Sequence, residues 1–74
     1  MEYNFNVIIN NKIGILTISS YLFQLKYDQI RIRDSEPNII FINETNMLYK
    51  FSDREYNIVF CDEKNFKIKE YINL

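Results

Sequence analysis

The sequence predicts an all-β fold, mostly antiparallel, in the form of a small barrel or sandwich of six to seven strands with at most one short helix. Apolar residues recur along the chain with a period of two, which is the period of strands. Turn-forming residues interrupt this pattern every eight to twelve residues. Eight of the ten acidic residues fall at these predicted turns. The 74 residues are enough for one domain, so residues 1–74 are expected to form a single small β domain.

The first two predicted strands form a hairpin. Over residues 2–9, aromatic and aliphatic side chains alternate with Glu and Asn, and a second apolar segment covers residues 13–19. Asn10 and Asn11 lie between them, and Asn tolerates the positive φ angles of a tight hairpin turn. Gly14 marks a bulge or a point where another part of the chain approaches closely.

Residues 21–27 alternate again, with apolar side chains at all four odd positions. After Asp28 and Gln29 the apolar side chains move to even positions, so a bulge or a tight turn must intervene there. A helix that begins at Ser19 or Ser20 and runs to about residue 28 is the alternative. We favour the strand, because three of the four apolar side chains are aromatic.

Residues 34–38 combine acidic, Ser, Pro and Asn residues and predict a loop. The four apolar residues that follow, 39–42, have no polar alternation and predict a central strand that is covered on both faces. Two further strands are expected around residues 47–51 and 56–60. The final segment, 66–74, fits a strand or a helix, and Asp62 could cap such a helix.

The overall charge and the segment composition exclude several classes of protein. A net charge of −1 argues against extensive nucleic-acid binding, which needs an excess of Lys and Arg, and against DNA mimicry, which needs many uncompensated carboxylates. One cysteine cannot form an intramolecular disulfide. The N-terminus has no signal-peptide pattern, and no apolar run is long enough to span a bilayer. We therefore expect a cytoplasmic protein without membrane association.

The usual residues of catalytic sites are missing. The chain has no His, and its single Gly excludes the phosphate-binding loops that contain several glycines. Cys61 has no imidazole partner and is expected to be a buried structural thiol. The paired carboxylates at the turns are typical of solvated loops. The sequence thus predicts no enzymatic activity, no cofactor and no metal site.

The aromatic content of 16% exceeds what a core of this size needs. Surplus Tyr is typical of protein interfaces, particularly when Arg lies nearby. Arg31 and Arg33 share one face of their predicted strand, where salt bridges with neighbouring carboxylates are their expected main use. The predicted partner-binding residues are Tyr21, Tyr27, Arg31, Arg33, Tyr49 and Tyr56.

These features favour a non-enzymatic module that binds a protein partner stoichiometrically. Ile, Asn, Lys, Tyr and Phe make up 41 of the 74 residues, and their codons are rich in A and T, as in phages and mobile elements of low-GC bacteria. The hypothesis is therefore an inhibitor of a bacterial defence system, of the anti-CRISPR type.

Three alternatives stay open. In a small barrel that binds single-stranded nucleic acid, Tyr21, Phe23 or Tyr27 would stack on bases while Lys26 and the arginines meet phosphates. The chain could instead be a small subunit of a larger assembly. A homodimer is the third option, because open strand edges in a small domain are readily completed by a second copy.

Overall fold

The computed structural model describes residues 2–63 and 65–72. Its elements, in chain order, are β1 (Tyr3–Ile9), β2 (Lys12–Ile18), β3 (Phe23–Tyr27), β4 (Ile30–Asp34), β5 (Asn38–Ile42), β6 (Asn46–Phe51), β7 (Arg54–Phe60) and α1 (Asn65–Ile72). The prediction of an all-β fold with one short helix is confirmed.

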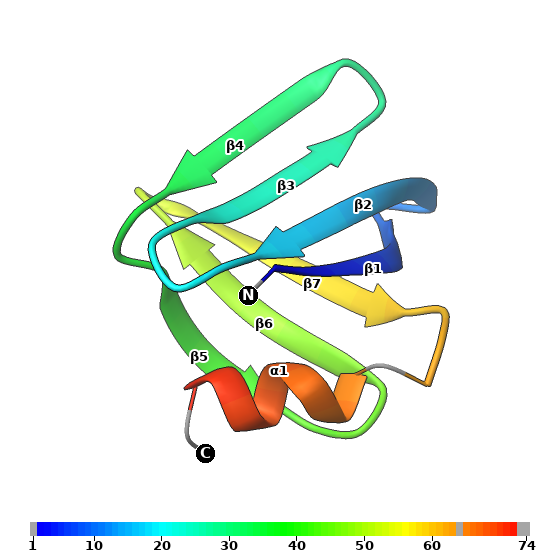
Figure 1. The fold of residues 1–74 in the computed structure, drawn as a ribbon. Helices are drawn as coiled ribbons and strands as arrows, with labels where there is room; N and C mark the ends of the chain where they lie inside the picture. Colours follow the sequence, from blue (N-terminus) through cyan, green and yellow to red (C-terminus); the bar gives the residue numbers. More distant parts are fainter. Residues whose placement is uncertain (1, 64, 73–74) are drawn as a thin grey trace.

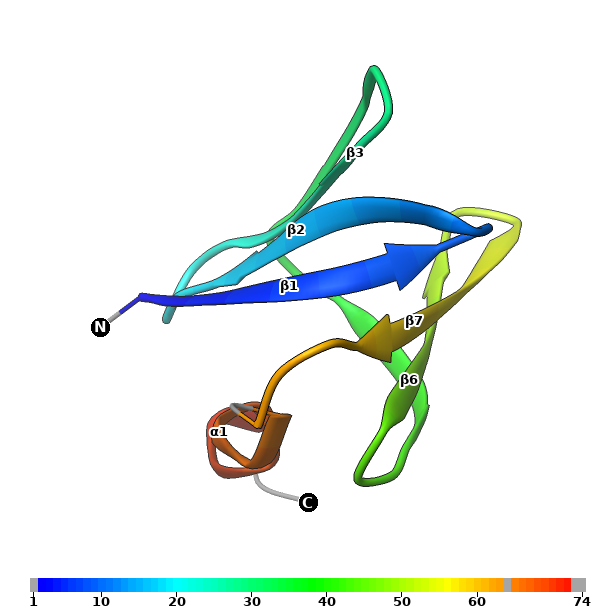
Figure 2. The same ribbon diagram turned by 90° about the vertical axis from the view of Figure 1, so that its right-hand side faces the viewer.

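The strands form one antiparallel sheet in the order β4-β3-β2-β1-β7-β6-β5. The sheet curls on itself into a half-barrel, so strands distant in this order face one another across the interior (Figure 1). Figure 2 shows the curl from the side, with the β3–β4 hairpin rising away from β6 and β7. β4 and β5 are the two ends of the sheet, and the connection through residues 35–37 joins them directly.

The β1–β2 hairpin forms as predicted. Asn10 and Asn11 have φ angles of 51° and 64°, the left-handed conformation that a two-residue hairpin turn requires and that Asn adopts more readily than most residues. Gly14 is a point of close approach: a Cβ there would lie 2.6 Å from the Cβ of Tyr27 on the neighbouring strand. Even Ala at this position would force β2 and β3 apart.

Residues 23–27 are a strand, as favoured over the helix. Asp28, with a φ angle of 54°, turns the chain into β4, and the register places Tyr27 opposite Ile30. This turn moves the apolar side chains from odd to even positions while keeping them on the same face of the sheet. A tight turn is therefore the reason for the change of parity.

The prediction of a central strand at residues 39–42 is wrong, because β5 is an edge strand that pairs only with β6 in the described part of the chain. Its register skips one residue: Ile39 lies opposite Tyr49, and Phe41 lies opposite Leu48. The skipped residue, Ile40, forms a β-bulge. The bulge keeps Ile39 and Ile42 packed against the core although they are three residues apart, and leaves Ile40 and Phe41 47% and 52% exposed.

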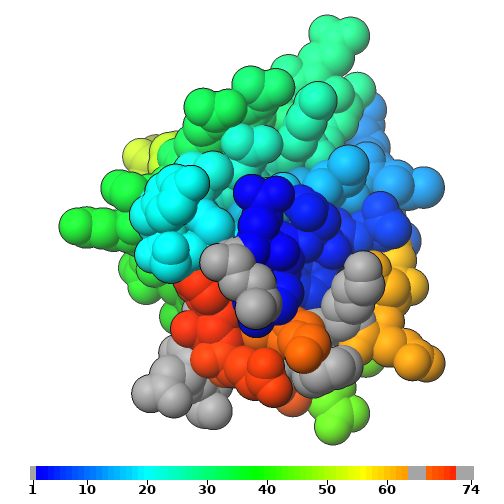
Figure 3. Space-filling model, in the orientation of Figure 1, coloured from blue at the N-terminus to red at the C-terminus, as the bar shows by residue number. Residues whose placement is uncertain are grey.

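The core fills the concave side of the sheet. Phe23 on β3 and Tyr49 on β6 meet across the interior with ring centroids 4.5 Å apart, so the two ends of the sheet are packed together. α1 covers the lower end of the half-barrel (Figure 1), and its Ile68 is fully buried. In the space-filling view, α1 meets β1 and the β2–β3 connection on one face (Figure 3).

The C-terminal segment was predicted to be a strand or a helix, and its described part is a helix. Over residues 65–72 the chain is helical, with Ile68 as its main contact to the core. Within the described residues, no helix has the length and apolar character needed to cross a bilayer.

Candidate functional site

Three of the predicted partner-binding tyrosines are core residues. Tyr49 is fully buried, and Tyr27 and Tyr56 are 6% and 9% exposed. Tyr49 and Tyr56 stack with ring centroids 6.0 Å apart. The alternation that placed these residues on strands also places them on the inward face, where their rings fill the half-barrel. They contribute to folding and are not accessible to a partner in the folded chain.

Tyr49 links β6 to the end of β4. Its hydroxyl donates a hydrogen bond of 2.8 Å to Oδ2 of Asp34, whose Oδ1 accepts a second bond from the Glu36 backbone N–H. Burial raises the pKa of the Tyr49 phenol well above its usual value, and the hydrogen bond to Asp34 raises it further. This contact therefore joins β6 to β4 across the open side of the curled sheet. We call this junction between Tyr49 and Asp34 the seam.

The two predicted arginines lie where the sequence placed them, on the outer face of β4. The register brings Arg31 opposite Lys26, and the Arg33 Nε donates a 2.9 Å hydrogen bond to Gln24. Asp28 pairs instead with Lys12 at 2.8 Å. Since no ion pair joins either arginine to a carboxylate among the described residues, the expectation of salt bridges there is wrong. Lys26, Arg31 and Arg33 together form a basic face.

Tyr21 is the predicted tyrosine that is accessible, at 77% exposure in the β2–β3 connection. Phe23 and Tyr27, which would also have stacked on bases in a nucleic-acid-binding barrel, are buried. The structure thus brings the basic residues together but does not place a row of exposed aromatic rings beside them.

Cys61 is exposed, so the prediction of a buried structural thiol is wrong. It follows β7 at the point where the chain leaves the sheet, and Val59 beside it is also partly exposed at 38%. The thiol lies in a shallow groove whose other polar lining includes Glu44, Asp62 and Glu63. Among the described residues, no group of three or more cysteines and carboxylates is arranged to hold a metal ion.

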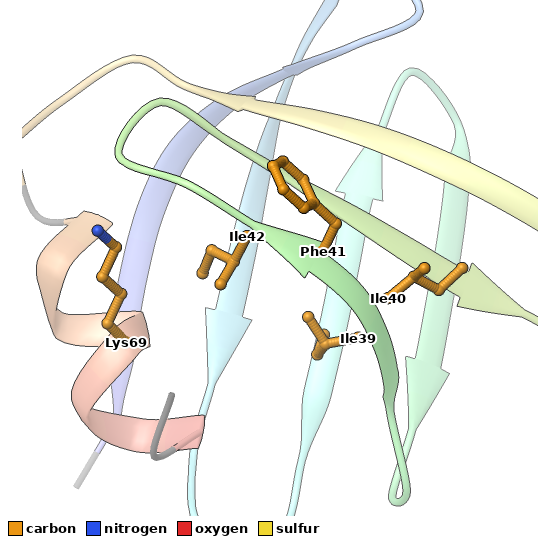
Figure 4. A pocket seen from close by; sticks show the side chains of 5 residues that line it. All are labelled: Ile39, Ile40, Phe41, Ile42 and Lys69. Atoms are coloured by element: carbon orange, nitrogen blue, oxygen red, sulfur yellow. The ribbon is translucent and has the colours of Figure 1, made fainter.

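The sequence did not predict an accessible apolar site that lies along the β5 edge. Four consecutive β5 residues and one residue of α1 line an open groove of about 430 Å³, which we call the β5 groove. Its lining residues are Ile39, Ile40, Phe41, Ile42 and Lys69. Figure 4 shows Ile42 on the side of β5 that faces α1, with the Lys69 side chain rising from the helix beside it.

Two kinds of contact are available in the β5 groove. Within the described residues β5 pairs with β6 alone, so the backbone N–H and C=O groups on its other edge have no strand partner there. The exposed Ile40 and Phe41 add apolar surface. Lys69 adds a positive charge that no ion pair joins to a carboxylate among the described residues. The groove can therefore bind both the backbone and the side chains of another segment.

One signal for this site was present in the sequence. A Pro directly before a strand is typical of sheet edges, since Pro cannot donate to a neighbouring strand, and Pro37 precedes β5. The uninterrupted apolar run was the stronger signal, and it pointed to the interior. The bulge at Ile40, which reconciles the run with an exposed edge, has no clear sequence pattern.

Comparisons of the chain with protein families, with curated proteins and with solved structures found no match.

Proposed function

We propose that this protein is a non-enzymatic binding module that acts by stoichiometric contact with a protein partner through the β5 groove. One observation carries the proposal: an unpaired strand edge coincides with exposed apolar side chains and with a groove. Open apolar edges are usually blocked by charge, by Pro or by a covering element, because they promote association. β5 follows Pro37 and carries the bulge at Ile40, but it has no charged residue and leaves Ile40 and Phe41 exposed, so this edge is a surface suited to binding.

For the biological role we propose inhibition of a bacterial defence system, of the anti-CRISPR type, in the cytoplasm. The support is compositional: the residue usage is typical of phages and mobile elements, and the small chain carries no recognisable catalytic residue set. Blocking a host protein by direct contact needs only a folded surface.

Two isoleucines provide a matched pair of variants for the test. Ile40 on β5 and Ile30 on β4 are 47% and 45% exposed, and each lies on an end strand of the sheet. An Asp at either position introduces the same charge at the same exposure. Ile40→Asp should abolish capture of the partner from a nuclease-treated bacterial lysate, and Ile30→Asp should retain it.

The same pair tests the proposed role in cells. In a bacterium with an active CRISPR–Cas system, expression of the wild-type chain should raise the plaquing efficiency of a targeted phage. Ile30→Asp should do so equally, and Ile40→Asp should not. The same plaquing efficiency with the wild-type chain, Ile30→Asp and Ile40→Asp would contradict the proposal. Equal capture of the partner by both variants would also contradict it.

The basic face supports a second candidate function, the binding of single-stranded nucleic acid. Lys26, Arg31 and Arg33 lie on adjacent strands, and no ion pair with a carboxylate is found for them within the described residues. Three phosphate contacts predict that the logarithm of affinity falls with the logarithm of salt with a slope of about −2. Loss of captured material on nuclease treatment, together with such a slope for an oligothymidine probe, would favour this function.

A further inference from the structure

The β5 groove also indicates the kind of segment that binds there. This inference rests on the proposed function and specifies how the partner is recognised. We propose that an extended apolar segment of the partner protein adds to β5 as an eighth strand, with one side-chain carboxylate of that segment bound to Lys69. The backbone edge, the apolar lining and the lysine each define one part of this ligand.

The backbone edge requires an extended segment. An antiparallel sheet gains a strand when the free N–H and C=O groups of its edge pair with another chain, and this mode gives affinity through main-chain hydrogen bonds. The groove runs along β5 from Ile39 to Ile42 and is bordered by α1 at one side. Its lining therefore follows the direction that an added strand would take.

Lys69 defines the charge of the segment. It lies beside Ile42, so a carboxylate at the corresponding end of the added strand would reach its ammonium group (Figure 4). Glu44, Asp62 and Glu63 line the second groove, which Lys69 also borders. Additional acidic residues in the segment would be repelled there, so a single carboxylate fits best.

The bulge and the composition of β5 argue against a second copy of this chain as the occupant. A bulge twists its strand, and two rigid sheets that both carry one pair poorly, whereas a flexible peptide can follow the twist. β5 itself carries no charged residue, so the β5 strand of a second copy offers no carboxylate for Lys69. A distinct partner can carry its carboxylate within the paired strand, whereas the nearest carboxylates of a second copy lie outside β5, at Glu36 and Glu44.

The test begins with a display library of random dodecapeptides selected on the immobilised full chain, with the Ile40→Asp variant used to remove background binders. The enriched peptides should contain a run of apolar β-branched residues with one Asp or Glu. Failure to enrich any peptide over the Ile40→Asp background would overturn the proposal.

An N-methyl scan of the best peptide then tests strand addition directly. Successive N–H groups of a strand point to opposite sides, so only every second one can pair with β5. Methylation should weaken binding by about tenfold or more at alternate positions and have little effect between them. A scan without this alternation would show recognition by side chains alone and would overturn strand addition.

Charge reversal tests the role of Lys69. Lys69→Glu should weaken binding of the acidic peptide by about tenfold, and replacing the acidic residue of the peptide with Lys should restore it. Lys12→Glu on β2, outside the groove, is the control and should leave the affinity unchanged. Equal losses in both variants, or no rescue, would overturn the assignment to Lys69.

The outcomes separate this inference from the proposed function. A protein partner that depends on Ile40, combined with a flat N-methyl scan, would overturn strand addition and leave the proposed function standing. A peptide that adds as a strand, with no protein retained from lysate, would support strand addition and contradict the proposed function. A wild-type dimer in sedimentation that Ile40→Asp dissociates would assign the edge to a second copy and overturn the distinct partner.

Discussion

The two end strands of the sheet are similar in length but differ in the chemistry of their edges. Three of the five residues of β4 are charged, namely Arg31, Arg33 and Asp34, whereas β5 has no charged residue. Charged side chains on an edge discourage the addition of another strand, because pairing would bury or crowd them. Charge therefore protects the β4 edge, and the β5 edge lacks this protection.

The seam between the two ends holds the half-barrel together. β4 and β5 are not neighbours in the sheet, and Tyr49 makes contacts across the interior, where it packs on Phe23 and bonds to Asp34. The same residue thus connects the protected end of the sheet to the strand that supports the open one. Substitutions at the seam and at the two edges should separate folding from binding.

The largest effect is expected for Tyr49→Ala. Truncating a fully buried aromatic ring leaves a cavity and typically costs about 3–5 kcal/mol. The variant should lose most of the stability of so small a domain, measured as the free energy of unfolding in urea. A Tyr49→Ala variant that stays as stable as the wild type but no longer binds a partner would restore Tyr49 as a contact residue and contradict its role at the seam.

The two edges should respond differently to the same truncation. Ile32 on β4 is 7% exposed and points into the core, whereas Ile40 on β5 is 47% exposed at the bulge. Ile32→Ala should lower the free energy of unfolding by about 2–4 kcal/mol, and Ile40→Ala by less than about 1 kcal/mol. Equal losses would mean that the β5 edge is part of the core and not a free surface.

Most of the fold could be predicted because its signals are local. The alternation of apolar side chains and the turn residues at Asn10, Asn11 and Asp28 depend on neighbours in the chain, and the strands and turns that they indicate are present. The order of strands in the sheet depends on long-range pairing, so the local signals could not decide it: Pro37 indicated an edge at residues 39–42, and the longer apolar run indicated the interior. An apolar run looks the same in a buried strand and in an exposed strand with a bulge.

The candidate site was predicted only in part for the same reason. Arg31 and Arg33 lie outside because their strand alternates cleanly, but the same alternation puts Tyr27, Tyr49 and Tyr56 inside. Composition alone could not divide the tyrosines between core and surface. Lys69 lines the β5 groove because α1 packs beside β5. It lies 27 residues after Ile42 in the chain, and no spacing in the sequence predicts such a contact.

Removal of the Tyr49 hydroxyl should have a smaller effect than either of the two core truncations. Tyr49→Phe keeps the ring and removes the hydrogen bond to Asp34, which should lower the free energy of unfolding by about 1–2 kcal/mol at pH 7. The variant should change neither partner capture nor peptide binding, since the Tyr49 hydroxyl is directed at Asp34 of β4 and Tyr49 does not line the β5 groove.

The pH dependence of this loss identifies the phenol as its source. Because the pKa of Tyr49 is raised in the folded protein, a Tyr in the unfolded chain ionises first, at about pH 10, and the folded state then binds more protons than the unfolded state. The contribution of Tyr49 is thus fully present below about pH 10 and is lost as the pH rises further. Urea unfolding between pH 8 and pH 11 should show the wild type losing more stability than Tyr49→Phe, so that the two curves converge. Parallel curves would show that the Tyr49 phenol ionises as easily in the folded chain as in the unfolded one, and the bond to Asp34 would then contribute nothing to closing the seam.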